Sequence, residues 1–310
     1  MSSTAADWTR QPERGSVLLM RLIAWIGLRL GRRAARALLP PICLYFLLAA
    51  PAPRRASRAY LRRVLGRAPR WREQYRHFHT FAATILDRVF LLNDRLDLFE
   101  LHVHGEEHAR SAHASGQGRL VLGAHLGSFE AVRAFGHHVQ AAPPLALLMY
   151  EANAQKMRRV LGALNPAATQ EIIALGELDA MLHVQQRLQE GAFIGMLADR
   201  SFHGTGAGAH EEVRWLPFLG EPAPFPLGPF RLAALLRRPL LLMLGLYQGG
   251  SRYDIHFELL ADFSAPQPDR RAAVEQALRT YVQRLEHHCR ANPYNWFNFY
   301  DFWSSEHATH

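Results

Sequence analysis

Two residues in the first half of the chain, His125 and Glu130, have the types and surroundings for acid–base chemistry. An apolar run from Arg119 predicts a buried strand that ends at Gly123, and a helix is expected to begin near Ser128. His125 then lies in the connecting loop, at the carboxyl edge of the sheet, where α/β proteins bind their ligands. An imidazole placed there takes a proton from a hydroxyl group, while a carboxylate fixes its tautomer and stabilises the imidazolium.

The spacing of His125 and Glu130 matters because residues five apart lie on different faces of a regular helix. With His125 in the loop and Glu130 one turn into the helix, the imidazole can fold back toward the carboxylate. We therefore predict a catalytic pair, His125 and Glu130, although 17 histidines and 27 acidic residues also produce such spacing by chance. Ser128 is expected to cap the helix, since the Gly-x-Ser-x-Gly pattern of a nucleophile elbow is absent.

Further candidates for binding substrate are polar residues near the ends of other predicted elements. Asp199 and Arg200 follow the apolar run 192–197 and are expected to position a donor or acceptor head group, with a buried ion pair as the alternative. Arg158 and Arg159 are candidates for binding phosphate, with solvated helix residues as the alternative. The aromatic residues 294–303 are expected to line an apolar tunnel, to contact lipid or to form a packed terminus.

Cysteine usage argues against disulfides and zinc. Cys43 and Cys289 are the two cysteines and lie far apart, without metal-ligand spacing. We expect no metal and no tightly bound cofactor, and a reducing compartment.

The pattern beyond residue 98 predicts an α/β fold with a mainly parallel sheet covered by helices. Strands are expected at 101–103, 119–123, 145–150, 192–197, 240–247 and 253–260, and helices around 128–139, 153–164, 178–189, 228–237 and 269–291. A glycine-rich stretch, 202–212, is expected to be a mobile loop. We divide the chain into N-terminal helices expected to associate with a membrane (1–56) and an α/β domain (57–310) with a helical lead-in (57–97).

The net charge of +9 is concentrated near the N-terminus, where residues 1–76 hold 16 arginines and three acidic residues. At 100° per residue, Arg21, Arg29, Arg32, Arg33 and Arg36 fall on one stripe about 120° wide, with apolar residues around the rest of the helix. This pattern is typical of a helix at an anionic membrane surface with its guanidinium groups toward phosphates. A helix packed on its own domain is the alternative, and nucleic acid is disfavoured because no binding motif is found.

The next segment, Ala37–Pro53, has 17 residues without a charge. A membrane span needs about 20 apolar residues, and Pro40 and Pro41 interrupt this one. We expect a piece that dips into the membrane, with a full span or a cleaved signal peptide as less favoured alternatives.

Three sequence blocks resemble the lysophospholipid acyltransferase superfamily, in particular its bacterial lipid A late (secondary) acyltransferase branch. The first is GAHLGSFE, whose His125 and Glu130 match the family's His-x4-Asp/Glu motif. The second runs from Leu197-Ala-Asp199-Arg200 through 215–220 to 224–233, and the third is the Pro- and Trp-containing segment 292–303. The resemblance covers roughly residues 15–303 and implies O-acyl transfer from an acyl thioester to a lipid hydroxyl, with no covalent acyl-enzyme.

Two departures from the branch concern the acceptor. Tyr150-Glu151 stands where Tyr-Arg is frequent, and Arg200 replaces a common Gln. The resemblance therefore leaves lipid A-like lipids, aryl polyenes and other glycolipids as acceptors. Alternatives are a lysophospholipid or glycerol-phosphate acyltransferase, and a catalytically silent lipid-binding subunit.

The resemblance also implies a place and a donor, namely the cytoplasmic face of a bacterial inner membrane and a thioester of acyl carrier protein or coenzyme A. Acyl carrier protein is the expected partner, because it is small and acidic and residues 54–76 are rich in arginine. A coenzyme A site would need a glycine-rich loop running into a helix N-terminus, and the loop at 204–208 leads instead into Glu211 and Glu212.

Overall fold

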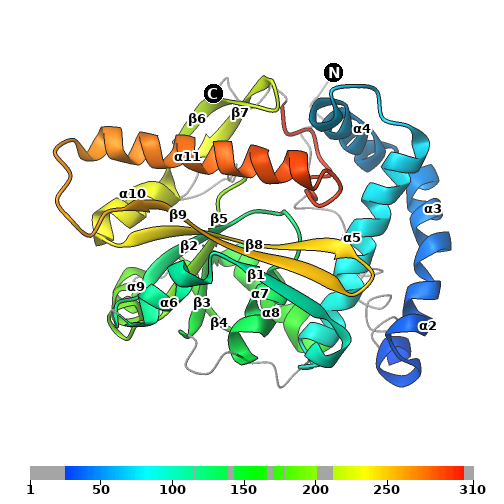
Figure 1. Cartoon of the computed structure of the whole chain (residues 1–310), viewed down its shortest axis with the longest axis horizontal. Coiled ribbons are helices and arrows are strands. Elements are labelled where there is room, and N and C mark those ends of the chain that lie inside the picture. The colour runs from blue at the N-terminus through cyan, green and yellow to red at the C-terminus, as the bar shows by residue number, and fades with distance from the viewer. Residues whose placement is uncertain are drawn as a thin grey trace.

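The computed structural model describes residues 25–114, 116–138, 143–165, 170–176, 179–200 and 212–303. Helices surround one central sheet, and the N-terminal helices stand along one side of it (Figure 1). The predicted loop 202–212 falls almost wholly outside the described residues, as does Arg21.

The central sheet has seven strands in the order β1-β9-β8-β2-β5-β3-β4. Their bounds are β1 Glu100–His104, β2 Arg119–Gly123, β3 Leu145–Tyr150, β4 Glu171–Leu175, β5 Phe193–Leu197, β8 Pro239–Gly249 and β9 Arg252–Asp262. All neighbouring pairs are parallel except β8 and β9, which form an antiparallel hairpin. The predicted α/β class with a mainly parallel sheet is confirmed.

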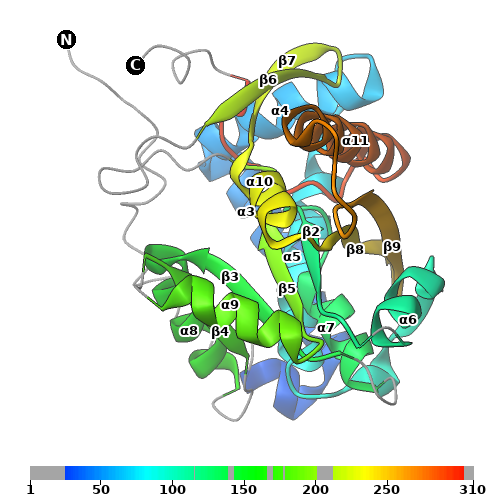
Figure 2. The ribbon, with the colours of Figure 1, turned by 90° about the vertical axis from the view of Figure 1, so that its left-hand side faces the viewer.

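Helices cover both faces of the sheet because β2 alternates its buried side chains between them. On one face, Leu120 and Leu122 belong to a core that includes residues of α9 (Ala180–Gln189), α10 (Gly228–Leu236) and α11 (Arg270–Ala291). On the other face, Val121 packs with Val132 of α7 (Phe129–His138). Figure 2 shows α9 and α10 in front of the sheet.

The remaining elements complete these layers. They are α2 Arg32–Ala37, α3 Leu39–Ala49, α4 Pro51–Leu65, α5 Trp71–Leu91, the short 3-10 helix η1 Leu96–Leu98, α6 Glu106–Ala114, α8 Glu151–Leu164 and the hairpin β6 Val213–Phe218 with β7 Glu221–Pro226. The predictions missed α6, β4, β6 and β7. Strands β6 and β7 were not predicted because β6 contains one proline and β7 contains three, which a two-stranded hairpin tolerates.

The predicted N-terminal helix is interrupted at Gly31, which has a φ of +87°. Arg32 turns toward the protein and forms a bidentate ion pair with buried Asp87 of α5, with N–O distances of 2.7 and 2.8 Å. Arg36 contacts the same carboxylate and the hydroxyl of Tyr247. Our prediction that Arg32 and Arg36 face membrane phosphates is therefore wrong, because a buried carboxylate requires paired cations.

Helix α3 has one buried and one exposed apolar face. Leu39, Cys43 and Leu47 pack in a core with residues of α5, whereas Tyr45 and Leu48 are 65% and 66% exposed. Within the described residues, no single helix has the length and apolarity to cross a membrane. The pair formed by residues 32–49 and 51–65 passes together by length and composition, but it is bent by 95°.

Candidate active site

The loop after β2 holds His125 against the rest of the fold through its backbone. The amide N–H of Phe297 donates to the His125 carbonyl (2.7 Å), and the amide of Gly127 donates to the Asn295 carbonyl (2.9 Å). On the opposite side, the Ser128 amide donates to the Gly245 carbonyl of β8 (2.7 Å). The loop is thus clamped between the C-terminal segment and a central strand.

The glycine at position 127 is required by this close approach. Its φ is +81°, and a Cβ added there would lie 2.1 Å from the carbonyl oxygen of Gly245. A side chain would therefore push the loop away from β8. Ser128 caps α7, as predicted: its hydroxyl accepts a hydrogen bond from the Ala131 amide (3.3 Å).

The ring of His125 is held by Asp199. Strand β5 lies beside β2 in parallel register, with Gly123 opposite Leu197. Two residues further along each strand, Nδ1 of His125 is 2.9 Å from Oδ1 of Asp199, and the His125 amide donates to Oδ2 at 3.0 Å. An ionised carboxylate accepts only, so we assign the proton to Nδ1. Nε2 then carries the lone pair.

Asp199 itself is completely buried. Trp296 Nε1 and Asn298 Nδ2 also donate to it, at 3.1 and 3.2 Å. Burial opposes ionisation of this carboxyl, but the charge of His125, its hydrogen bonds and the charge of Arg200 outweigh burial and lower the pKa to about 2. The structure thus shows Asp199 bound to His125. A contact of Asp199 with substrate stays a prediction, and it would require these protein donors to move.

The environment of His125 favours the neutral imidazole. Burial lowers its pKa first, the positive charges of Arg200 and Arg88 lower it further, and the Asp199 carboxylate partly opposes them. The side chain keeps 30% of its surface exposed. His125 therefore combines a fixed tautomer, a neutral ring and access from outside, which together suit a general base.

Glu130 lies one turn into α7 and is buried. Its carboxylate is 2.7 Å from Nε of Arg88 in α5 and accepts a hydrogen bond from the Ser128 hydroxyl (3.2 Å). Among the described residues no hydrogen bond joins Glu130 to His125. The predicted orienting contact is therefore made by Asp199, because the strand register brings β5 alongside the loop while Arg88 holds Glu130.

The predicted arginines differ in position. Arg200 lies at the site: Nε donates to Asn298 Oδ1 (2.6 Å), and its guanidinium carbon is 5.3 Å from the centre of the Tyr300 ring. Arg158 and Arg159 are exposed on α8 and contact Glu151, the Ile172 carbonyl and the Gln155 carbonyl. None of these contacts joins them to His125. Substrate binding by all three arginines stays a prediction.

The C-terminal segment 292–303 supplies several of the groups that surround His125 and Asp199. Trp296 is fully buried among aromatic rings of Tyr60, Phe218 and Phe302, so the terminus is packed, as one of the alternatives predicted. Its backbone carbonyl accepts from Nε2 of buried His77 (2.8 Å), whose Nδ1 faces the Ser57 hydroxyl (2.9 Å). Asn295 and Asn298 were the signal in the sequence for this role, because an amide within a buried aromatic segment must have hydrogen-bond partners.

One group of side chains has the grouping of metal ligands: His256, Glu258 and His288 offer ligand atoms within 4.8 Å of one another. The carboxylate of Glu258 already accepts from both Arg284 (2.7 Å) and His288 (2.7 Å). These two contacts already neutralise the Glu258 carboxylate. Because the Arg284 guanidinium occupies it, the group is a poor fit for a metal cation.

Comparison with known families adds the decisive observation. The pattern that describes bacterial lipid A biosynthesis acyltransferases matches residues 9–305, nearly the whole chain. The chain belongs to this family. No individual curated protein matches it. Family membership makes the chain an acyltransferase that acts on lipid, and the match includes the loop with His125 and Glu130, the end of β5 with Asp199, and the C-terminal segment.

Proposed function

We propose that the protein transfers a fatty acyl group from an acyl thioester to a hydroxyl of a lipid or glycolipid, with His125 as the general base. The observation that carries the proposal is the hydrogen bond between His125 Nδ1 and the buried Asp199 carboxylate, which leaves the lone pair on Nε2. Family membership supports the reaction class.

The proposed reaction needs no covalent enzyme intermediate. Nε2 takes the proton of the acceptor hydroxyl as its oxygen attacks the thioester carbonyl carbon. The carbon–sulfur bond of the tetrahedral intermediate then breaks, and the imidazolium returns the proton to the departing thiolate. Asp199 stabilises the imidazolium between these two steps. The products are an ester and a free thiol.

Positive charge beside the ring supports the proposal because the tetrahedral intermediate carries an oxyanion. Arg200 and Arg88 both lie close enough to lower the pKa of His125. We assign stabilisation of developing charge to Arg200 and keep Glu130 in the catalytic group, where it holds Arg88 in place.

A lipid A-like, aryl polyene or related lipid is the proposed acceptor, and a thioester of acyl carrier protein is the proposed donor, ahead of coenzyme A. The proposed location is the cytoplasmic face of the inner membrane. A membrane surface is supported by the exposed apolar side chains of α3 and by Arg54, Arg55 and Arg58, which are exposed on the next helix, α4. Arg29 and Arg33 are exposed as well.

The test is acyl transfer by purified protein in lipid vesicles, followed by mass spectrometry of the lipid product. His125→Ala should lower turnover by about 10² to 10⁴, the usual contribution of a general base. Its circular dichroism should match the wild type, because the His125 amide, Trp296 and Asn298 still donate to the buried Asp199 carboxylate. Transfer by this variant at the wild-type rate would exclude His125 as the base.

A catalytically silent lipid-binding subunit is the competing function, and water as acceptor distinguishes it. An active His125–Asp199 pair should hydrolyse acyl thioesters slowly without lipid, and His125→Ala should abolish that hydrolysis. Absence of both transfer and hydrolysis in the wild type would favour the silent subunit.

A further inference from the structure

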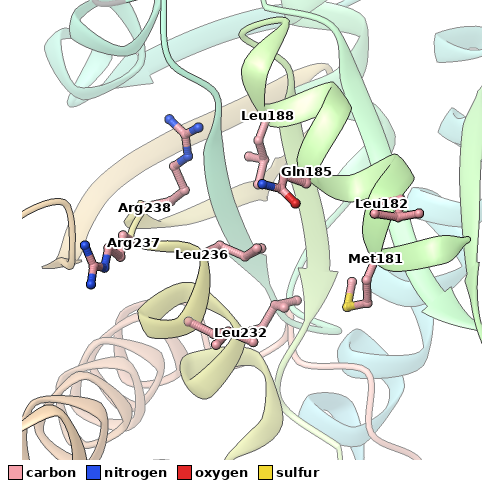
Figure 3. A pocket seen from close by; sticks show the side chains of 9 residues that line it. Met181, Leu182, Gln185, Leu188, Leu232, Leu236, Arg237 and Arg238 are labelled. Atoms are coloured by element: carbon pink, nitrogen blue, oxygen red, sulfur yellow. The ribbon is translucent and has the colours of Figure 1, made fainter.

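Apart from the N-terminal helices, large exposed apolar side chains gather between α9 and α10. Leu182 is 70% exposed, Leu235 is 67% exposed and Met181 is 40% exposed. They belong to a hollow of about 410 Å³ between the two helices, with Arg237 and Arg238 at one end (Figure 3). We call this hollow and its neighbour the α10 groove.

The neighbouring hollow, of about 610 Å³, lies between α10 and the start of α11 and shares Leu232 and Leu235 with the first. Arginines line both hollows and no acidic residue does: Arg231, Arg237, Arg238, Arg270 and Arg271. Two of these arginines have acidic neighbours: Arg231 forms an ion pair with Glu212, and Nε of Arg271 is 3.9 Å from a carboxylate oxygen of Glu275. This cluster of arginines is unusual for its part of the chain, since residues 77–310 hold more acidic residues (24) than basic ones (20).

The position of the α10 groove distinguishes a soluble partner from a membrane. Figures 1 and 2 place α10 and α3 on opposite sides of the molecule. If the exposed face of α3 lies on a membrane, the α10 groove faces water. Exposed leucines rimmed by arginines then match an amphipathic acidic helix of a soluble protein.

The buried face of α10 is connected to the strand before the catalytic loop through one layer of side chains. Phe230 on the buried face of α10 packs against Tyr281 of α11, with ring centres 5.6 Å apart. The Tyr281 hydroxyl donates to the carbonyl of Gly123 at 3.0 Å, two residues before His125. Helix α10 is therefore connected, through Tyr281, to the end of β2 that leads into the catalytic loop.

We propose that the α10 groove docks the acyl carrier protein, through an acidic helix whose apolar residues contact Leu232 and Leu235. This inference rests on the proposed function and locates its donor. It moves the donor surface away from residues 54–76, which we assign to the membrane. A small thioester without the carrier would bypass the α10 groove.

The experiment compares two donors with the same acyl chain, one on acyl carrier protein and one on pantetheine alone. Arg237→Glu and Leu235→Asn should each raise KM for the carrier thioester about tenfold, the effect of losing one strong interface contact. The kcat for the carrier and both constants for acyl-pantetheine should stay unchanged. Arg279→Glu on α11 and Leu259→Asn on β9 are matched controls, since both residues are exposed and lie outside the α10 groove.

The outcomes separate the two proposals. If the wild type transfers the acyl group from neither donor, the proposed function is wrong. Transfer from both donors, with the α10 variants equal to their controls on the carrier, would overturn the docking site. Light scattering on the same variants completes the test: a dimer that Arg237→Glu dissociates, with unchanged KM, would assign the α10 groove to a second copy of the chain and also overturn the proposal.

Discussion

At the scale of single residues, two carboxylates compete for the role of orienting His125. Asp199 hydrogen-bonds the ring directly, whereas Glu130 contacts Arg88 and Ser128. A carboxylate that accepts from Nδ1 fixes the tautomer and stabilises the imidazolium, and a carboxylate held by an arginine acts through that arginine. The sequence predicted one carboxylate beside His125. In the structure Asp199 orients the ring and Glu130 holds Arg88.

We predict that Asp199→Asn lowers kcat more than Glu130→Gln does. The amide cannot stabilise an imidazolium as a carboxylate does, so a loss of about 10² or more is expected for Asp199→Asn. Initial rates of both variants decide this, with urea unfolding to confirm that each remains folded. A larger loss for Glu130→Gln would return the orienting role to Glu130.

Arg200 adds to burial in lowering the pKa of His125 and thus the pH at which the base becomes available. Its positive charge lowers the pKa of His125, and the rate should rise as pH increases through that pKa because the neutral ring is the base. Arg200→Gln removes this charge, so the midpoint of the kcat/KM profile should shift to higher pH. An unshifted midpoint would show that Arg200 does not act on the ring. Arg279→Gln, which removes an exposed arginine on α11, is the control.

At the scale of elements, α3 shows how one helix serves two surfaces. Every fourth residue, at Leu39, Cys43 and Leu47, packs toward α5, which leaves the opposite apolar face without a partner in the described structure. A helix with one packed and one exposed apolar face suits a membrane interface better than a span.

We predict that Tyr45→Ser with Leu48→Ser releases protein from vesicles, while the melting temperature stays within a few degrees of the wild type. Both side chains are largely exposed, so their removal costs about 0.5 kcal/mol or less of folding free energy. Vesicle sedimentation measures the binding. Leu47→Ser is the contrasting variant, because Leu47 is buried and should lower the melting temperature instead. Undiminished binding of the double variant would place the membrane contact elsewhere.

At the scale of the whole molecule, buried His77 joins three parts of the chain. It lies on α5, accepts from Ser57 of α4 and donates to the carbonyl of Trp296, whose indole reaches Asp199. Burial lowers its pKa to about 4, and the hydrogen bond to Trp296 opposes burial. The unfolded chain, with an ordinary pKa near 6.5, takes up the proton first as the pH falls.

Stability should therefore be complete above pH ~6.5 and decline as the pH falls toward 4. At pH 5 the contribution lost through His77 is on the order of 2 kcal/mol. Urea unfolding at pH 7 and pH 5 should show a smaller decline in His77→Gln than in the wild type. Equal declines would mean that other groups govern acid unfolding.

Local sequence determined much of this protein. Alternation of apolar runs and helical patterns gave the α/β class, because each element must bury one face, and the run before Gly123 marked the strand that presents His125. The motif around His125 and the closing aromatic segment also carry the resemblance to the acyltransferase family. Asp199 was recognised as a site residue because it ends a buried strand.

Tertiary structure decided which of these residues meet. Asp199 reaches His125 because β5 pairs with β2 in a register that sequence spacing does not encode, and Glu130 turns to Arg88 because α5 packs on α7. The sequence predicted that Arg32 and Arg36 belong to a membrane-facing stripe. In the structure both contact Asp87, which lies more than 50 residues away in the chain. A helical stripe shows which side chains share a face, whereas the buried charge that this face meets depends on the whole fold.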